Sequence, residues 1–425
     1  MINCTLVVSD SASAKSYDYQ AIIVRPSANI NFSDISFCLN LSLSKYFLLK
    51  DFSSIISAVN VVASTINYAN CSGALNCTGL NRGVCLNTPH TCSACMTQHS
   101  GVTGADNSYC RPSSAYVIPV GGACTERTAT DCLYFTCLNN TCVAPSKPCR
   151  SQYTDSVCSG HGSCYFYNKV TDRVIENCLV TDTYCVSLCN CTFGYGGEYC
   201  HLTPTDLISV SFARQKMCTA ISQLIVYQDG SPDTLILQAS SLSQAFDPFQ
   251  LSSNGLLGAC TDSLVSLAAL SSDGYITGTN VGTPDTLADV ISQFLNIKIL
   301  SPDSYSHDVR SAIESAILGL QEGIHRDMVP GQQAVLIVNS NIQLKVLYPL
   351  VSSLHDSSLS PPALYGLPQS SLQLPEQGLD ACELTNGYVQ LSVMQYGVDI
   401  VSTGKQVSRP SLSTPMGFNH LPLQF

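Results

Sequence analysis

Cysteines are the side chains in this sequence most able to do chemistry, and most of them lie close together. Eighteen of the 23 cysteines fall between Cys71 and Cys200, which is 18 of 130 positions, or about 14%. A density above ~8–10% already indicates a disulfide scaffold. We therefore expect this block to be held by disulfides instead of an ordinary apolar core, and to fold in an oxidising compartment on the secretory route.

Two other cysteine chemistries compete with disulfide formation. Cys92-Ser-Ala-Cys95 has the spacing of a thioredoxin-type redox pair and of half a zinc site, as in a cytosolic metal-binding protein. The redox chemistry needs a strand-to-helix setting and a lowered thiol pKa. Zinc ligation needs a second matching pair, which the sequence lacks. We therefore predict that Cys92 and Cys95 are structural half-cystines.

The other reactive residue types form no catalytic pattern. No histidine lies in a recognisable metal or nucleophile motif, and there is no glycine-rich phosphate loop. An acidic cluster near residues 303–327 is better explained as a solvated helix face than as a catalytic carboxylate pair. The histidines are His90, His99, His161, His201, His307, His325, His355 and His420. We predict no catalytic residue, no cofactor and no metal, and hence no enzyme.

The composition is poor in charge. Charged residues make up 12% of the chain, the formal net charge is −11, and Lys and Arg total 19. The missing basic surface argues against nucleic-acid binding. N-glycans would keep such a surface soluble, and Asn-x-Ser/Thr acceptor sites precede residue 200 only. These sites are Asn3, Asn31, Asn40, Asn70, Asn76, Asn139 and Asn190.

The first residues do not read as a secretory leader. Residues 1–10 lack both a basic segment and an apolar segment of 7–15 residues. No apolar run reaches ~18 residues, the length needed to span a membrane. We interpret the chain as an internal piece of a larger secreted or membrane-anchored protein, with any anchoring outside it.

Residues 1–70 are predicted to be a β-rich piece that ends in a helix. Strands are expected at Thr5–Val8 and Tyr17–Val24, and a further one is considered for residues 34–42. Cys4 and Cys38 are then expected to pair. From Asp51, an N-cap residue type, apolar residues recur at helical spacing up to residue 66.

Spacing divides the cysteine block into units with even counts. Residues 71–148 hold a group of six cysteines, Cys71 to Cys110, and a group of four, Cys124 to Cys142. The last eight cysteines lie in residues 149–200. Because every count is even, each unit is able to close its disulfides internally.

After the block, cysteines almost disappear and helical periodicity takes over. Four apolar stripes within residues 205–330 predict a small helical bundle, with Cys218 linked to Cys260 between two helices. From Ala334 to Tyr348, and again at Tyr388–Tyr396, the period becomes two, which predicts a β-sandwich-like subdomain over residues 331–425. The fold class is thus a multidomain α+β protein.

One motif in the block is specific. Cys158-Ser-Gly-His-Gly-Ser-Cys164 and the run Cys189-x-Cys191-x-x-Gly-Tyr-x-x-x-x-Cys200 closely resemble the epidermal-growth-factor-like (EGF-like) family. The resemblance implies the disulfides Cys149–Cys164, Cys158–Cys189 and Cys191–Cys200. A long insertion departs from the family pattern, and we expect its Cys178 and Cys185 to pair. The acidic or amide residues of calcium-binding members are missing ahead of Cys149, so no calcium is expected.

The overall layout resembles the ectodomains of polycystin-like proteins, of receptor-for-egg-jelly proteins and of large protist surface proteins. In these, the last region is similar to a GPCR-autoproteolysis-inducing (GAIN) domain. The chain has no Trp and no cysteine after Cys382, so the self-cleaving element of that family has no visible counterpart. Cys382 is left without a predicted partner, which suggests an intermolecular link.

Two functional hypotheses follow. The first is a non-enzymatic adhesion or ligand-binding segment at the cell surface, in which the EGF-like unit is a rigid spacer. The second is the ectodomain of a receptor or channel that couples an extracellular signal to membrane segments outside this chain. The sequence does not name a ligand.

Overall fold

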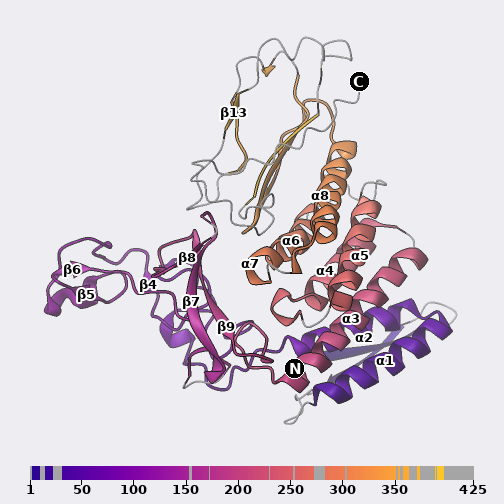
Figure 1. The fold of residues 1–425 in the computed structure, drawn as a ribbon, viewed down its shortest axis with the longest axis horizontal. Coiled ribbons are helices and arrows are strands. Elements are labelled where there is room, and N and C mark those ends of the chain that lie inside the picture. The colour runs from indigo at the N-terminus through magenta and orange to yellow at the C-terminus, as the bar shows by residue number, and fades with distance from the viewer. Residues whose placement is uncertain are drawn as a thin grey trace.

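The computed structural model describes residues 2–9, 15–22, 31–152, 156–171, 173–228, 230–251, 254–271, 283–301, 304–350, 353–354, 358–362, 371–373, 388 and 390–396. They form a mixed α+β, cysteine-rich protein. Helices make one body, the cysteine-rich block forms an arm on one side of it, and strands extend from its far end (Figure 1). The expected α+β class is confirmed at this coarse level.

The first strands are confirmed and the third is wrong. Strand β1 (Ile2–Ser9) pairs antiparallel with β2 (Lys15–Ile22). Residues 34–42 instead belong to helix α1 (Phe32–Leu49), which Asn31 caps by accepting a hydrogen bond from the Ser33 amide. Leu39 and Leu43 are buried. Residues four apart lie on one face of a helix, but they also lie on one face of a strand. A window of nine residues therefore does not distinguish the two structures.

The error in α1 also removes a predicted disulfide. Cys38 lies on the exposed side of the helix and is free, so the expected Cys4–Cys38 link is wrong. That link assumed that both residues lie in one sheet. Helix α1 turns Cys38 away from the buried Leu39 and Leu43 side.

The helix predicted from Asp51 to residue 66 is confirmed, and it belongs to a larger core than expected. Helix α2 (Phe52–Ile66) begins after Asp51, whose side chain accepts from the Ser54 amide. Its buried Ile55 and Val59 share one apolar cluster with α1 and with the helices that follow the cysteine block. The division at residue 70 therefore does not separate two cores. Residues 71–200 are an insertion between two helices of one body (Figure 1).

The helices after the insertion complete this body. All four predicted stripes are helical, and α4 and the short α7 are additional. The helices are α3 (Pro204–Tyr227), α4 (Pro232–Ala245), α5 (Asn254–Leu270), α6 (Thr283–Leu295), α7 (Ile297–Leu300) and α8 (His307–Asp327). The disulfide Cys218–Cys260 joins α3 to α5, as expected. It fixes two helices that already share the apolar core.

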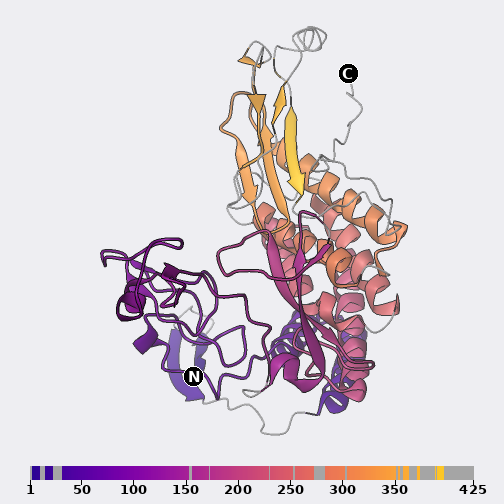
Figure 2. The same ribbon diagram turned by 60° about the vertical axis from the view of Figure 1, so that its left-hand side comes forward.

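A sheet extends the helical core at its C-terminal end. Strands β10 (Val335–Val338), β11 (Ile342–Leu347) and β14 (Leu391–Tyr396) form an antiparallel sheet in the order β10-β11-β14 (Figure 2). Ile342, Leu344 and Val346 of β11 alternate into the shared core. Strands β12 (Ser358–Leu359) and β13 (Leu372–Gln373) pair separately. In the described part of residues 331–425 these two sheets are the β structure, so the sandwich remains a prediction.

The cysteine block folds as the three units that the spacing predicts, here called modules 1, 2 and 3 (residues 71–110, 124–142 and 149–200). In module 1, β3 (His99–Ser100) pairs with β4 (Arg111–Pro112), which directly follows the module. In module 2, β5 (Cys137–Leu138) pairs with β6 (Thr141–Cys142). Module 3 contains a larger sheet of β7 (Gly162–Asn168), β8 (Arg173–Ile175) and β9 (Cys185–Cys191), in the order β8-β7-β9. The remaining chain runs through turns and short 3-10 helices held by disulfides.

Candidate functional site between the cysteine-rich modules

Disulfides close every module internally. Module 3 has all four expected links, Cys149–Cys164, Cys158–Cys189, Cys191–Cys200 and, in the insertion, Cys178–Cys185. Module 2 has Cys124–Cys137 and Cys132–Cys142, and module 1 has Cys71–Cys85, Cys77–Cys92 and Cys95–Cys110. Cys92 and Cys95 therefore belong to different disulfides. They form no redox pair in this state.

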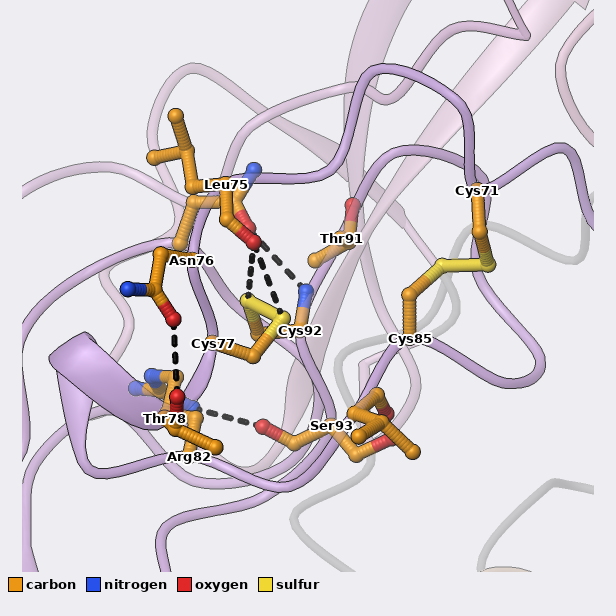
Figure 3. The surroundings of a disulfide bond; sticks show 12 residues. Cys71, Leu75, Asn76, Cys77, Thr78, Arg82, Cys85, Thr91, Cys92 and Ser93 are labelled. Carbon is orange, nitrogen blue, oxygen red and sulfur yellow. Dashed lines mark hydrogen bonds between the residues drawn. A yellow bond between two sulfur atoms is a disulfide. The ribbon is translucent and has the colours of Figure 1, made fainter.

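A buried arginine organises module 1 in place of apolar side chains. Arg82 is fully buried. Its guanidinium donates to the backbone carbonyls of Val102 and Gly104, each at 3.0 Å, and to that of Ser93 at 3.2 Å. Figure 3 shows Arg82 beside Ser93, together with the disulfides Cys71–Cys85 and Cys77–Cys92. One cation thus satisfies several carbonyls that would otherwise be buried without donors.

A cleft of about 630 Å³ separates module 1 from module 3, and we call it the intermodule cleft. Both modules contribute to its walls. Module 1 supplies Gly73, Leu75, Pro89, His90, Thr91, Asp106 and Asn107; Pro148, from the segment that leads into module 3, and Cys149, Arg150, Ser151, Ser156 and Val157 supply the opposite side. The cleft is large enough for several side chains of a partner or for a small ligand.

Two apolar side chains face the cleft from opposite sides. Leu75 of module 1 is 56% exposed, and Val157 of module 3 is 57% exposed. Each lies on a segment next to a cystine, so its backbone is fixed although its side chain is free to contact a partner. Apolar side chains exposed on a rigid concave surface are typical of protein-binding sites.

The charges of the cleft are opposite and are already oriented. The Asp106 carboxylate accepts from the Ser108 amide at 2.7 Å. The Arg150 guanidinium donates to the Ala105 carbonyl of module 1. Arg150 therefore holds module 3 against module 1 and still lines the cleft. A partner would meet one acidic and one basic group beside the two apolar side chains.

His90 makes a second connection across the modules. Its Nδ1 accepts from the Gly73 amide at 3.1 Å, and its Nε2 lies 2.6 Å from the Gln152 carbonyl oxygen. Its backbone is in the left-handed region, with φ of 53°, where few non-glycine residues lie without a local reason. In the sequence, His90 is only a histidine outside known motifs.

A smaller cavity of about 180 Å³ lies where module 3 meets the helices. Glu198, Tyr199 and His201 of the module 3 side face Asp247 and Gln250 there. Burial lowers the pKa of His201. Desolvation, and after it the charge of Asp247, raises the pKa of Glu198, although solvent still reaches that side chain. The cavity is thus an acidic pocket with a neutral histidine.

The buried Arg214 of α3 fixes the helical wall of this smaller cavity. Its guanidinium donates to Asn67 Oδ1 at 2.6 Å, to Gln250 Oε1 at 2.7 Å and to the Ala245 carbonyl at 2.8 Å. Asp247 lies 3.6 Å away. Because Asn67 follows α2 and Gln250 follows α4, one side chain ties together the helices at the base of the insertion.

Within the part of the chain that the structure describes, neither the cavities nor the cysteines provide a metal centre. Across the described ranges, the groups of three or more side chains close enough to hold a metal are two cysteine triplets, Cys124, Cys132, Cys142 and Cys149, Cys158, Cys189. All six are half-cystines. Their sulfur atoms are therefore not available as the thiolates that zinc binds.

The predicted glycan acceptors lie mostly at the surface. Asn31, Asn76, Asn139 and Asn190 are exposed, and Asn40 and Asn70 are partly buried. The Asn31 and Asn76 amides also act locally, since Asn31 caps α1 and Asn76 Oδ1 accepts from the Thr78 hydroxyl at 2.7 Å. The side chain of Asn3 and all of Cys382 lie outside the described residues. Glycosylation at these positions stays a prediction.

Comparisons with known proteins add no relative. No protein-family model matches the chain, and neither the curated proteins nor the solved structures give a match. Among the described helices, none is both long and apolar enough to cross a membrane.

Proposed function

We propose that the chain is an extracellular segment of a cell-surface or secreted protein, and that its intermodule cleft binds a protein partner. The observation that carries this proposal is the pair of exposed apolar side chains, Leu75 and Val157, which face one cleft from two disulfide-fixed modules. Ten disulfides are typical of proteins that work in oxidising surroundings.

Module 3 is, in this proposal, an EGF-like unit. The support is the crossed order of Cys149–Cys164 and Cys158–Cys189, followed by the local Cys191–Cys200 link. Its role is that of a spacer, because the Gly197 amide donates to the Phe249 carbonyl of the helical body at 3.1 Å. A spacer attached in this way holds one wall of the cleft at a fixed position.

The partner that fits best is an extended protein segment with an apolar side chain. Leu75 and Val157 would contact that side chain, and Asp106 and Arg150 would fix the polar groups beside it. Such a segment buries apolar area in the cleft centre and keeps its polar rim hydrated, as in most protein interfaces. Adhesion through such contacts needs no catalytic group.

The proposal is tested by placing a charge in the cleft. Leu75→Asp and Val157→Asp are compared with Val84→Asp and Val174→Asp, whose parent side chains are 59% and 67% exposed and lie away from the cleft. Binding of the labelled chain to intact cells and to an array of extracellular protein domains is measured. We expect the cleft variants to bind about tenfold or more weakly, as when a central apolar anchor is lost. Equal binding by all four variants would contradict the proposal.

A second candidate function is the ectodomain of a polycystin-like receptor or channel. The supporting observation is the order of elements, in which a helical bundle leads directly into the antiparallel β10-β11-β14 sheet. This part would be the GAIN-like region. The coding sequence that follows Phe425 tests the idea, because a stop codon without membrane helices would exclude it.

A further inference from the structure

We propose that His90 is a pH-operated latch that keeps the intermodule cleft in its binding shape at neutral pH and releases it in acid. The inference rests on the proposed function of the cleft, whose regulation it concerns. It is carried by the two hydrogen bonds of the imidazole ring, one to Gly73 within module 1 and one to Gln152 of module 3.

The two partners of the ring demand one protonation state. The Gly73 amide is a donor, so Nδ1 must be an unprotonated acceptor. The Gln152 carbonyl is an acceptor, so Nε2 must carry the proton. Both contacts are made together only by the neutral imidazole with its proton on Nε2.

Protonation removes one of these contacts and keeps the other. In the imidazolium form Nδ1 carries a proton that points at the Gly73 N–H, so two donors face each other. Turning the ring over does not help, because both of its nitrogen atoms are then donors. The Gly73 amide is left without its acceptor, while Gln152 keeps its bond.

The backbone around His90 prevents the ring from moving away with its segment. The His90 amide donates to the Asn70 carbonyl at 2.8 Å, and the His90 carbonyl accepts from Asn107 Nδ2 at 2.8 Å. With these two bonds in place, the segment that carries Gly73 has to yield. That segment lies inside the Cys71–Cys85 loop and leads into Leu75, so its movement displaces one apolar wall of the cleft.

The charged groups near the ring act in opposite directions. Asp106 lines the cleft with a negative charge, and Arg150 lines it from module 3 with a positive one. Glu198 borders the adjoining cavity, which Pro89 and Gln152 also line, and desolvation raises the pKa of its carboxyl group, which disfavours a negative charge there. The contact that protonation breaks is therefore the hydrogen bond from the Gly73 amide to the ring, whichever of these charges lies closer to His90.

Hydrogen exchange without any partner tests the latch. Protection factors of amides 72–76 are measured at about pH 7 and again at about pH 5. We expect protection to fall roughly five- to tenfold in acid, as the loss of one hydrogen bond predicts. Nitrogen NMR of the labelled imidazole should give the Nε2–H tautomer at neutral pH. Unchanged protection, or a proton on Nδ1 at neutral pH, would overturn the proposal.

A matched pair of variants separates the latch from general acid effects. In His90→Gln the side-chain amide supplies one acceptor and one donor without titrating, so the pH dependence of amides 72–76 should disappear. His99→Gln changes a histidine of the same module whose Nδ1 lies 3.0 Å from the Thr97 carbonyl oxygen of its own loop, and the dependence should remain. A His90→Gln variant that keeps the dependence would contradict the latch even if its absolute protection is lower.

The latch and the binding function fail separately. The exchange and NMR measurements need no partner, so a missing binding activity leaves them interpretable. If Leu75→Asp and Val157→Asp abolish binding while exchange is independent of pH, the cleft binds without regulation by His90. If the hydrogen exchange of amides 72–76 depends on pH as predicted but no cleft variant affects binding, the segment moves with pH and the cleft is not a binding site.

Discussion

At the scale of single residues, buried arginines take the place of apolar packing where the insertion meets the helices and inside module 1. Arg82 and Arg214 are both fully buried and both bind mostly carbonyl and amide oxygens. Such oxygens spread the positive charge over several hydrogen bonds, which offsets part of the desolvation cost. Each arginine thus defines the shape of a loop-rich region that has few apolar side chains.

Removing the Arg214 guanidinium should therefore destabilise the helical body strongly. In Arg214→Met the buried oxygens of Gln250 and Ala245 lose their donor, so we expect the free energy of unfolding to fall by about 3–5 kcal/mol. Urea denaturation followed by helical circular dichroism gives the value. Arg310→Met is the control, because Arg310 pairs with Glu314 at 2.8 Å on a partly exposed helix face, and its loss should cost about 0.5 kcal/mol or less. Similar losses in the two variants would refute this role of Arg214.

The predictability of individual residues from sequence depended on the kind of information they carry. The links of module 3 follow from an ordered family signature, whereas Cys38 had no such pattern and its expected link to Cys4 was wrong. The cleft residues Leu75, His90 and Arg150 come together only because two modules pack side by side. The spacing of residues along the chain does not predict that contact. The one weak signal in the sequence was Leu75, an apolar residue between Cys71 and Cys77.

At the scale of elements, helices with one wide apolar face were predictable, and α1 was not. In α2 the buried Ile55, Ile56, Val59 and Ala63 recur over about two turns behind a capping Asp51. Helix α1 also has apolar residues on its exposed side, with Phe37 64% exposed and Leu41 54% exposed. Apolar residues on both sides hide the helical period, so a short window over residues 34–42 also fits a strand.

The contact between α5 and α8 depends on two glycines of α8. A Cβ atom at Gly319 would lie 2.5 Å from the Ala268 carbonyl oxygen, and one at Gly323 would lie 2.7 Å from that of Ser271. We expect Gly319→Ala to separate the helices and to cost about 1–3 kcal/mol, as overpacking of a close contact does. Thermal unfolding and the circular dichroism spectrum give the loss and its cause.

Gly258 offers the opposite case on the same pair of helices. It lies in α5 with no atom near its missing Cβ. Gly258→Ala should therefore stabilise the protein by about 0.5–1 kcal/mol, because alanine loses less backbone entropy in a helix. If both alanine variants shifted stability in the same direction, close backbone packing between α5 and α8 would not be what limits residue 319.

At the scale of the whole molecule, the chain is one helical body interrupted by an arm. Helices α1 and α2 precede the cysteine block, yet they share their apolar cluster with α3 to α8 and with β11. Sequence reasoning placed a boundary near residue 70, because the change in composition there is real. A change in composition indicates where the cysteine-rich segment begins. It does not predict that the helices before and after these 130 residues share one apolar core.

An inserted arm should be removable, whereas the helices on its two sides should not. Asn67, after α2, and His201, before α3, line the same small cavity, so a short Gly/Ser linker in place of residues 71–200 spans the gap. The helical body then loses few contacts, such as the Gly197 to Phe249 hydrogen bond, and its Tm should fall by no more than about 5 °C. Deleting residues 52–200 instead also removes Ile55 and Val59 from the core, and that chain should not unfold cooperatively. If the 71–200 deletion melts without cooperativity, the arm is part of the folding unit. If both deletions melt cooperatively, α2 is not part of the folding unit.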